Sequence, residues 1–193
     1  MTDRTDTKEA MGNALKDLVV KKSFDKISIS DITSACGLGR QSFYYHFQDK
    51  YQLLEWVFRE GALRPLHSDV TIKNWAKRLE QTLMAMEAER RFYVSAVKAQ
   101  PEFFSRCFSE ELEPLFGNLA DCIYQHGELS DARRDFGAEF YALGCSAVVT
   151  RWARGGMRTP AFALARDIYL LSKDGEWAHR RPEIGRASCR ERV

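Results

Sequence analysis

The sequence predicts an all-α protein built from a small N-terminal helical domain and a larger C-terminal one. Apolar side chains recur at steps of three and four residues along most of the 193 positions. The only alternation typical of a strand, Ile27–Ser30, is four residues long. Near the N-terminus a glycine-containing turn separates two short helical segments, whereas longer ones follow Pro65.

Composition is typical of a soluble globular chain, with 45% hydrophobic and 29% charged residues. No apolar run approaches the roughly 20 residues of a membrane helix, so we expect no membrane partner. The polar N-terminus, Met1–Gly12, lacks the apolar core of a signal peptide, which favours a cytoplasmic protein. Five cysteines without a CxxC pair favour reduced thiols over disulfides or a zinc site.

The first predicted helix starts at Thr5 or Thr7 and runs to about Lys22. Its apolar stripe has the spacing of one helix face and comprises Met11, Ala14, Leu15, Leu18 and Val19. After a turn at Ser23–Lys26, Ser28 and Asp31 have the spacing of a capping box. They predict a second, short helix.

The second helix is expected to run from about Ile29 to Cys36 and to end at Gly37, which tolerates a left-handed backbone. A third helix is predicted over Arg40–Phe47 and a fourth over about Lys50–Gly61, the latter capped by Asp49. The segment Leu63–Pro65 marks a boundary.

Five longer helices are predicted beyond this boundary, and Pro114 should kink or interrupt the third of them. Their ranges are Thr71–Glu87, Glu89–Lys98, Glu102–His126, Ser130–Arg154 and Pro160–Lys173. We therefore divide the chain into domains at residues 1–62 and 63–176, with a tail at 177–193. Residues 183–193 have no apolar stripe and are interpreted as vector read-through or an assembly scar, in which case the natural C-terminus is missing.

The segment Ile27–Tyr51 has the pattern of a helix-turn-helix. One set of its side chains is spaced to form a shared core with the first helix: Ile29, Ile32, Ala35, Leu38, Phe43 and Phe47. The exposed face of its second helix would then carry Arg40, Gln41, Ser42, Tyr44, Tyr45 and His46. Arginine can bond guanine and glutamine can bond adenine through two hydrogen bonds each. The pattern therefore indicates binding of double-stranded DNA.

Residues 5–62 resemble the DNA-binding domain of the TetR family. The resemblance rests on the run Phe43-Tyr44-Tyr45-His46-Phe47 and on the lysine that follows at position 50. It implies an all-helical homodimer with a three-helix DNA-binding domain and a C-terminal ligand-binding and dimerisation domain.

Carried over position by position, the resemblance implies roles for nine side chains. It implies that Arg40, Gln41 and Tyr44 contact the bases. Phosphate contacts fall to Ser42, Tyr45, His46 and Lys50, whereas Ser28 and Ser30 lie where the family touches phosphate or bases.

The C-terminal half is similar to a TetR subgroup that includes regulators of dihydroxyacetone kinase operons. The similar residues are Phe92-Tyr93 after a helix containing Trp75, and the run Arg151–Met157 before Pro160. Some members of that subgroup are activators that work with a partner protein. The expected partners are thus an operator, a second copy of the chain, and a small-molecule effector or a partner protein.

Two sets of side chains in this half have a structural and a functional interpretation. The first set could form packed core or line a ligand pocket, and it comprises Trp75, Leu79, Phe92, Tyr93, Phe103, Cys107, Phe108 and Tyr124. The second set could form internal core or a four-helix dimer interface, and it comprises Phe140, Gly144, Ala147, Val148, Arg151, Ala165, Ile168 and Tyr169. The acidic run Glu110–Glu113 is interpreted as a solvated helix face.

Other classes of function receive less support. Residues 1–60 carry nine basic and nine acidic side chains, which also suits a TetR-like coactivator that binds a partner protein. Motifs for nucleotide binding, zinc proteases and serine hydrolases are missing, so we expect no enzyme and no cofactor. Isolated histidines lack the spacing of metal ligands, so we expect no metal site.

Overall fold

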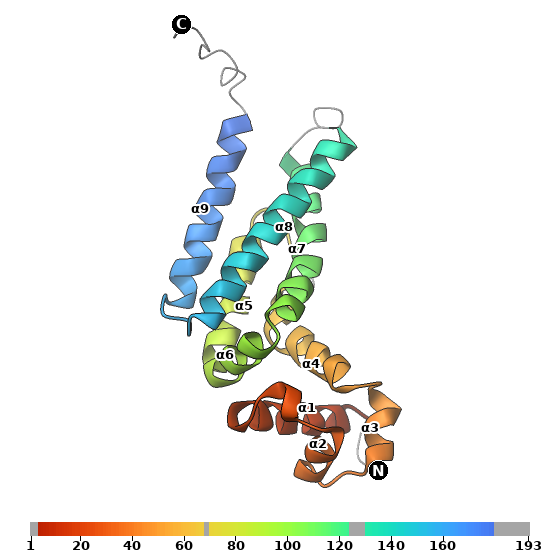
Figure 1. Ribbon diagram of the computed structural model, residues 1–193. Helices are drawn as coiled ribbons and strands as arrows, with labels where there is room; N and C mark the ends of the chain where they lie inside the picture. Colours follow the sequence, from red (N-terminus) through yellow and green to blue (C-terminus); the bar gives the residue numbers. More distant parts are fainter. Residues whose placement is uncertain (1–3, 68–69, 124–129, 180–193) are drawn as a thin grey trace, which may run out of the picture.

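A computed structural model describes residues 4–67, 70–123 and 130–179, and these hold helices and no strand. The prediction of an all-α fold is confirmed. Figure 1 shows the N-terminal helices grouped at one end, with the long C-terminal helices rising from them. The helices of the N-terminal group are α1 (Arg4–Lys21), α2 (Ile29–Ala35), α3 (Arg40–His46) and α4 (Lys50–Phe58). A 3₁₀ turn, Phe24–Lys26, lies between α1 and α2.

The second group comprises α5 (Trp75–Ala88), α6 (Arg90–Ala99), α7 (Pro101–Ile123), α8 (Asp131–Arg154) and α9 (Ala161–His179). Helices α7 and α8 run side by side over most of their length (Figure 1), and α9 packs on α5. The ring of Trp75 on α5 lies 5.7 Å from that of Tyr169 on α9. None of the described helices is long and apolar enough to cross a membrane.

The N-terminal group has its own core, to which all four helices contribute. Leu15, Ile32, Phe43 and Leu54 are fully buried there, together with Phe24 from the 3₁₀ turn. Phe47 is also buried, whereas Ala35, predicted to face this core, is exposed. Two aromatic side chains from α3 and its C-terminal end therefore fix that helix to the rest of the unit.

Local signals in the sequence set the ends of the short helices as predicted. The Ser28 side chain accepts a hydrogen bond from the Asp31 amide, and the Asp31 carboxylate accepts one from the Ser28 amide, so the capping box is present. Gly37 closes α2 with a φ of 69°, where a side chain would be strained. Asp49 caps α4 by accepting from the amides of Tyr51 and Gln52.

Several predicted features of the helices differ from the structure, and α9 runs to His179 rather than to Lys173. Helix α4 does not end at Gly61 but continues as a π-helical turn, Arg59–Leu63, and a 3₁₀ turn, Arg64–Leu66. Helix α5 begins at Trp75 rather than at Thr71, because the Asn74 side chain accepts a hydrogen bond from the Thr71 amide and holds these residues in a turn. Helix α7 is uninterrupted at Pro114, since burial of Leu112, Leu115 and Phe116 around it outweighs one lost backbone hydrogen bond.

We predict that Phe43→Ala lowers the free energy of unfolding by about 3–5 kcal/mol, because it leaves a cavity where a fully buried ring was. Urea unfolding followed by circular dichroism measures the change. Tyr44→Ala, at the neighbouring exposed position, serves as the control and should cost far less. Equal stability of Phe43→Ala and the wild type would show that the ring does not hold α3.

Candidate nucleic-acid interface

Helix α3 presents a polar and aromatic face to solvent while its other face is buried. Arg40 and Gln41 are exposed, and Tyr44 and Tyr45 are 58% and 68% exposed. Such exposure of two large aromatic side chains within one turn is unusual for a surface that meets only water. The four predicted side chains are thus accessible together, on a helix whose position is fixed by Phe43 and Phe47.

The serines and the histidine of the predicted site are less accessible, or they already form hydrogen bonds within the protein. Ser42 and His46 are half-buried, and the His46 ring meets the Tyr45 ring edge-on at 4.9 Å. The Ser28 hydroxyl donates to the Asp31 carboxylate at 2.7 Å as part of the cap. Ser30, also half-buried, accepts a hydrogen bond from Thr33 through its backbone carbonyl. Ser28 therefore has a structural role besides the predicted DNA contact.

A charge pair holds α1 against the start of α2. The Lys22 ammonium lies 2.8 Å from the Asp31 carboxylate, which the Ser28 amide and hydroxyl also approach. The hydrogen bond from Lys22 and those from Ser28 hold the pKa of Asp31 well below its usual range. Lys22 is consequently engaged within the protein rather than available to phosphate.

Lys50, which was expected to contact phosphate, forms hydrogen bonds within the protein. Its ammonium donates to the backbone carbonyls of Phe24, Asp25 and Ile27 at 2.9, 3.0 and 2.9 Å. It also lies 4.7 Å from the centre of the Phe24 ring. An ammonium group has three N–H donors, so these carbonyls use all of them. Lys50 fastens the turn before α2 to the start of α4.

The predicted pocket residues are mostly buried in the core of the second group of helices. Six of them are buried: Trp75, Leu79, Phe92, Tyr93, Cys107 and Phe108. The Trp75 ring lies 5.9 Å from that of Phe116, and Phe92 lies 4.9 Å from Tyr93. Burial raises the pKa of the Cys107 thiol to about 11, so it stays protonated. Phe103 is half-buried, and Tyr124 lies outside the described residues.

A groove of about 510 Å³ lies elsewhere, between α1 and the end of α4. Gly12 and Trp56 line it together with charged side chains of both signs. A Cβ atom at Gly12 would lie 3.0 Å from the Trp56 ring, so glycine permits the close approach of α1 and α4. The described residues contain no cluster of three or more side chains suited to a metal ion.

The predicted dimer interface is accessible on α8 but not on α9. On α8, Phe140 is 62% exposed, and Gly144, Ala147 and Arg151 are also exposed, with Val148 half-buried. On α9, Ala165 and Ile168 are buried within their own chain, and Tyr169 packs on Trp75. For α9 the structure therefore favours the internal-core interpretation, because that stripe holds α9 to its own protomer.

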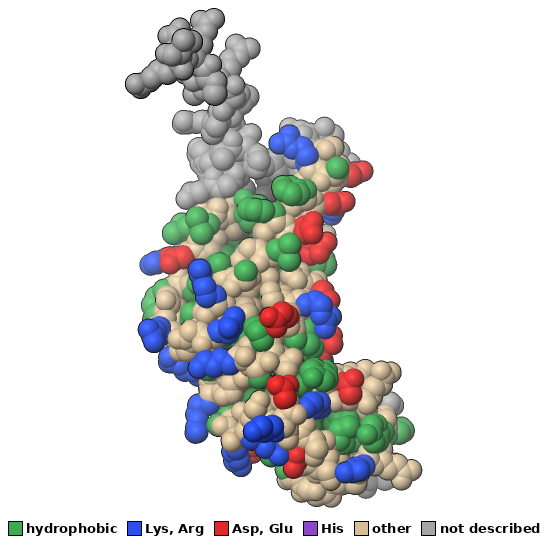
Figure 2. Space-filling view, in the orientation of Figure 1, with side chains coloured by type: hydrophobic (Ala, Val, Ile, Leu, Met, Phe, Trp, Pro, Cys, Tyr) green, Lys and Arg blue, Asp and Glu red, His purple; other side chains and the backbone are tan. Residues whose placement is uncertain are grey.

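A different set of apolar side chains on α9 faces solvent, namely Phe162, Leu170 and Leu171. Phe136, Phe140 and Leu143 of α8 are exposed as well, and we refer to these six side chains as the α8–α9 apolar face. In Figure 2, hydrophobic side chains gather over the upper part of these two helices.

Comparison with known families decides the classification. Residues 13–57 match the family described as bacterial regulatory proteins, tetR family, and residues 73–174 match the transcriptional regulator C-terminal region of TetR proteins. The chain belongs to the TetR family. The matched ranges cover α2–α4 and most of the second group of helices, so this TetR-family chain is a transcriptional regulator with a helix-turn-helix.

Individual relatives agree with the family. The transcriptional activator DhaS of the dhaKLM operon, from Lactococcus lactis, is 29% identical over 87 residues, which are 45% of this chain. The match spans only 46% of the length of DhaS. The solved structure of a dihydroxyacetone kinase operon activator DhaS covers 89% of this chain with a TM-score of 0.70 and 22% identity, matching 97% of its own length.

A second solved structure, the fatty acid degradation regulator FadR from Bacillus halodurans, covers 86% of this TetR-family chain and 93% of its own. Its TM-score is 0.60 and its identity 15%. Both structural matches have too low an identity to show more than the fold. The sequence match is to a regulator of the subgroup that the C-terminal motifs resemble.

We predict that Lys50→Met destabilises the protein by about 2 kcal/mol or more, because three backbone carbonyls lose hydrogen bonds from a charged group. Urea unfolding measures this. The slope of log affinity for DNA against log salt concentration should stay unchanged, since no phosphate contact is lost. A slope flatter by about one unit, with unaltered stability, would instead show that Lys50 contacts a DNA phosphate.

Proposed function

We propose that the protein binds a palindromic operator as a homodimer, with α3 of each copy in the major groove. The observation that carries this proposal is the two-sided nature of α3. Phe43 and Phe47 anchor it, while Arg40, Gln41 and Tyr44 are exposed along one short helix. Arginine and glutamine are the side chains that read guanine and adenine edges through paired hydrogen bonds. We assign base reading to these three residues and phosphate contact to Ser42, Tyr45 and His46.

The α8–α9 apolar face supports a dimer of this chain. Phe136 and Phe140 are 69% and 62% exposed, and their rings stack at 6.3 Å, so a large apolar surface lacks a partner within the protomer. Gly144 and Ala147 are exposed beside it and allow a second helix to approach closely. A twofold axis there would place two recognition helices at half-sites about 34–36 Å apart.

Regulation would follow from a ligand or partner that binds one arrangement of the dimer better than another. The packing of Trp75, Phe92 and Tyr93 against other rings favours a second candidate, in which a partner protein on the surface of α5–α9 controls the regulator. The name of the relative DhaS, an operon activator, is compatible with either. Because it acts on DNA, we assign the protein to the cytoplasm and assign it no catalytic role.

Selection of bound fragments from random double-stranded DNA tests the proposal most directly. We expect enrichment of a sequence with two inverted half-sites whose centres are one turn of the double helix apart, or a multiple of it. A reporter gene behind the selected operator then gives the sign of regulation. Recovery of no enriched sequence by a folded, dimeric protein would contradict operator binding and leave the partner-binding alternative.

We predict that Arg40→Ala weakens binding to the selected operator by about 1–3 kcal/mol and relaxes the choice of one base pair. Its guanidinium is exposed at the start of α3, so the substitution should not alter stability. Fluorescence anisotropy with single-base operator variants gives both quantities. Arg91→Ala, an exposed arginine on α6, is the matched control and should bind like the wild type.

We predict that Phe140→Arg converts the dimer into a monomer, because it places a charge in the centre of the α8–α9 apolar face. Analytical ultracentrifugation gives the oligomeric state. Met84→Arg on α5 replaces another half-exposed apolar side chain and should leave the dimer intact. If Phe140→Arg remains dimeric, the interface lies on another surface.

A further inference from the structure

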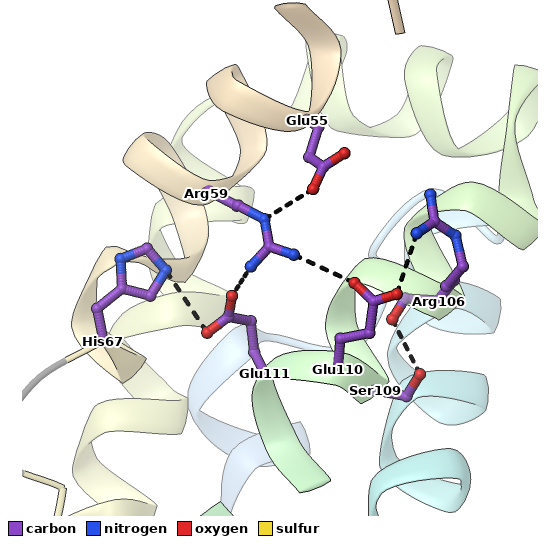
Figure 3. A network of polar contacts seen from close by, with 7 residues as sticks. All are labelled: Glu55, Arg59, His67, Arg106, Ser109, Glu110 and Glu111. Atoms are coloured by element: carbon purple, nitrogen blue, oxygen red, sulfur yellow. Dashed lines mark hydrogen bonds and ion pairs between the residues drawn. The ribbon is translucent and has the colours of Figure 1, made fainter. Parts of the chain in front are cut away.

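The junction between the DNA-binding unit and the second group of helices contains a network of ion pairs, drawn in Figure 3. Arg59, the first residue after α4, is at its centre. Its guanidinium Nε lies 3.0 Å from Glu55 on its own helix, and one Nη lies 3.1 Å from Glu110 on α7. The other Nη pairs with Glu111, also on α7, whose second oxygen lies 3.7 Å from the His67 ring.

The network has a charge balance that makes Arg59 hard to replace. One guanidinium faces the three carboxylates of Glu55, Glu110 and Glu111, and Arg106 is the other arginine that pairs with Glu110. The Glu111 side chain is only 17% exposed and that of Arg59 30%, so solvent screens the contact less than it screens an ordinary surface pair. Without Arg59, carboxylates on α4 and α7 would repel each other across the junction.

The backbone at this point is also specialised. The π-helical turn starts at Arg59, and such turns often mark functional positions within helices. A Cβ atom on Gly61 would lie 2.9 Å from the Tyr93 hydroxyl, so glycine permits the close approach of this turn to α6. The Phe58 ring, next to Arg59 in the chain, lies 4.7 Å from that of Phe104 on α7. The exit direction of α4 is thus set by contacts with α6 and α7.

The opposite side of the same segment is open. The groove of about 510 Å³ between α1 and α4 is lined there by Trp56, Glu60, Gly61 and Arg64. Elsewhere, Lys16 on α1 pairs with Glu89 at the start of α6, so the unit has a second attachment to the regulatory helices. The orientation of the two parts therefore rests on the contacts of α1 with α6 and on those of the α4 end with α7.

We propose that Arg59 is a positioning residue for operator binding, which ties the end of α4 to α7 and so orients the DNA-binding unit within the dimer. This inference rests on the proposed function, because orientation matters only if two recognition helices must meet two half-sites. Pre-organisation by Arg59 spares the dimer the entropy of ordering both units on the DNA. Neither the family match nor the relatives assign a role to this side chain.

The test compares full operators with single half-sites. Arg59→Gln should weaken binding of the full operator about fivefold or more, and leave binding of a half-site duplex unchanged, since α3 itself is intact. The charge-swapped pair Arg59→Glu with Glu111→Arg should recover at least part of the full-operator affinity. Unchanged or tighter operator binding by Arg59→Gln would overturn the proposal, as would an equal loss on the half-site.

Arg106→Gln is the matched control, because it removes an ion pair to the same Glu110 but within α7. It should bind the full operator like the wild type; a loss equal to that of Arg59→Gln would contradict a role for the junction. Hydrogen exchange gives a readout that needs no DNA. Arg59→Gln should accelerate exchange over residues 55–63 but not over α3. Unchanged exchange over residues 55–63 would contradict the proposal. If the wild type bound no operator, the proposed function would fail, whereas exchange would still report on the junction.

Discussion

The functional surface of this protein depends on the burial of two phenylalanine rings at the ends of one helical turn. Phe43 and Phe47 insert into a core made by α1, α2 and α4, and α3 has only seven residues. A helix that short is unstable by itself in water. Its conformation, and with it the outward direction of Arg40, Gln41 and Tyr44, is therefore a product of tertiary packing.

The same unit uses much of its positive charge internally. Lys16 pairs with Glu89, Lys22 with Asp31, and Lys50 binds three backbone carbonyls. These contacts explain how a DNA-binding unit can have as many acidic as basic residues. These cations assemble the unit and attach it to α6, while the side chains that we propose to read DNA are a few exposed ones on α3. Lys21 and Lys26, by contrast, are exposed.

The regulatory half is held together by aromatic contacts that extend toward the DNA-binding unit. Phe58, at the end of α4, lies among Tyr93, Phe104 and Phe108, and Arg59 then connects the surface of the same junction to α7. A change in how α6 and α7 pack would alter their contacts with the end of α4, and only through α4 would it alter the position of α3. This arrangement gives a TetR-family regulator of this kind a physical route between its two halves.

The sequence by itself determined the helices of the DNA-binding unit, the caps at Ser28 and Asp49, and the exposed face of α3, because each depends on local spacing and on neighbours within a few residues. Only the tertiary structure decided the role of Lys50, whose acceptors lie more than twenty residues away. It also decided which stripe of α9 is buried and that Glu110 and Glu111, expected to be solvated, face Arg59. Helical periodicity identifies an apolar or charged face, but which neighbour that face meets follows from how distant helices pack.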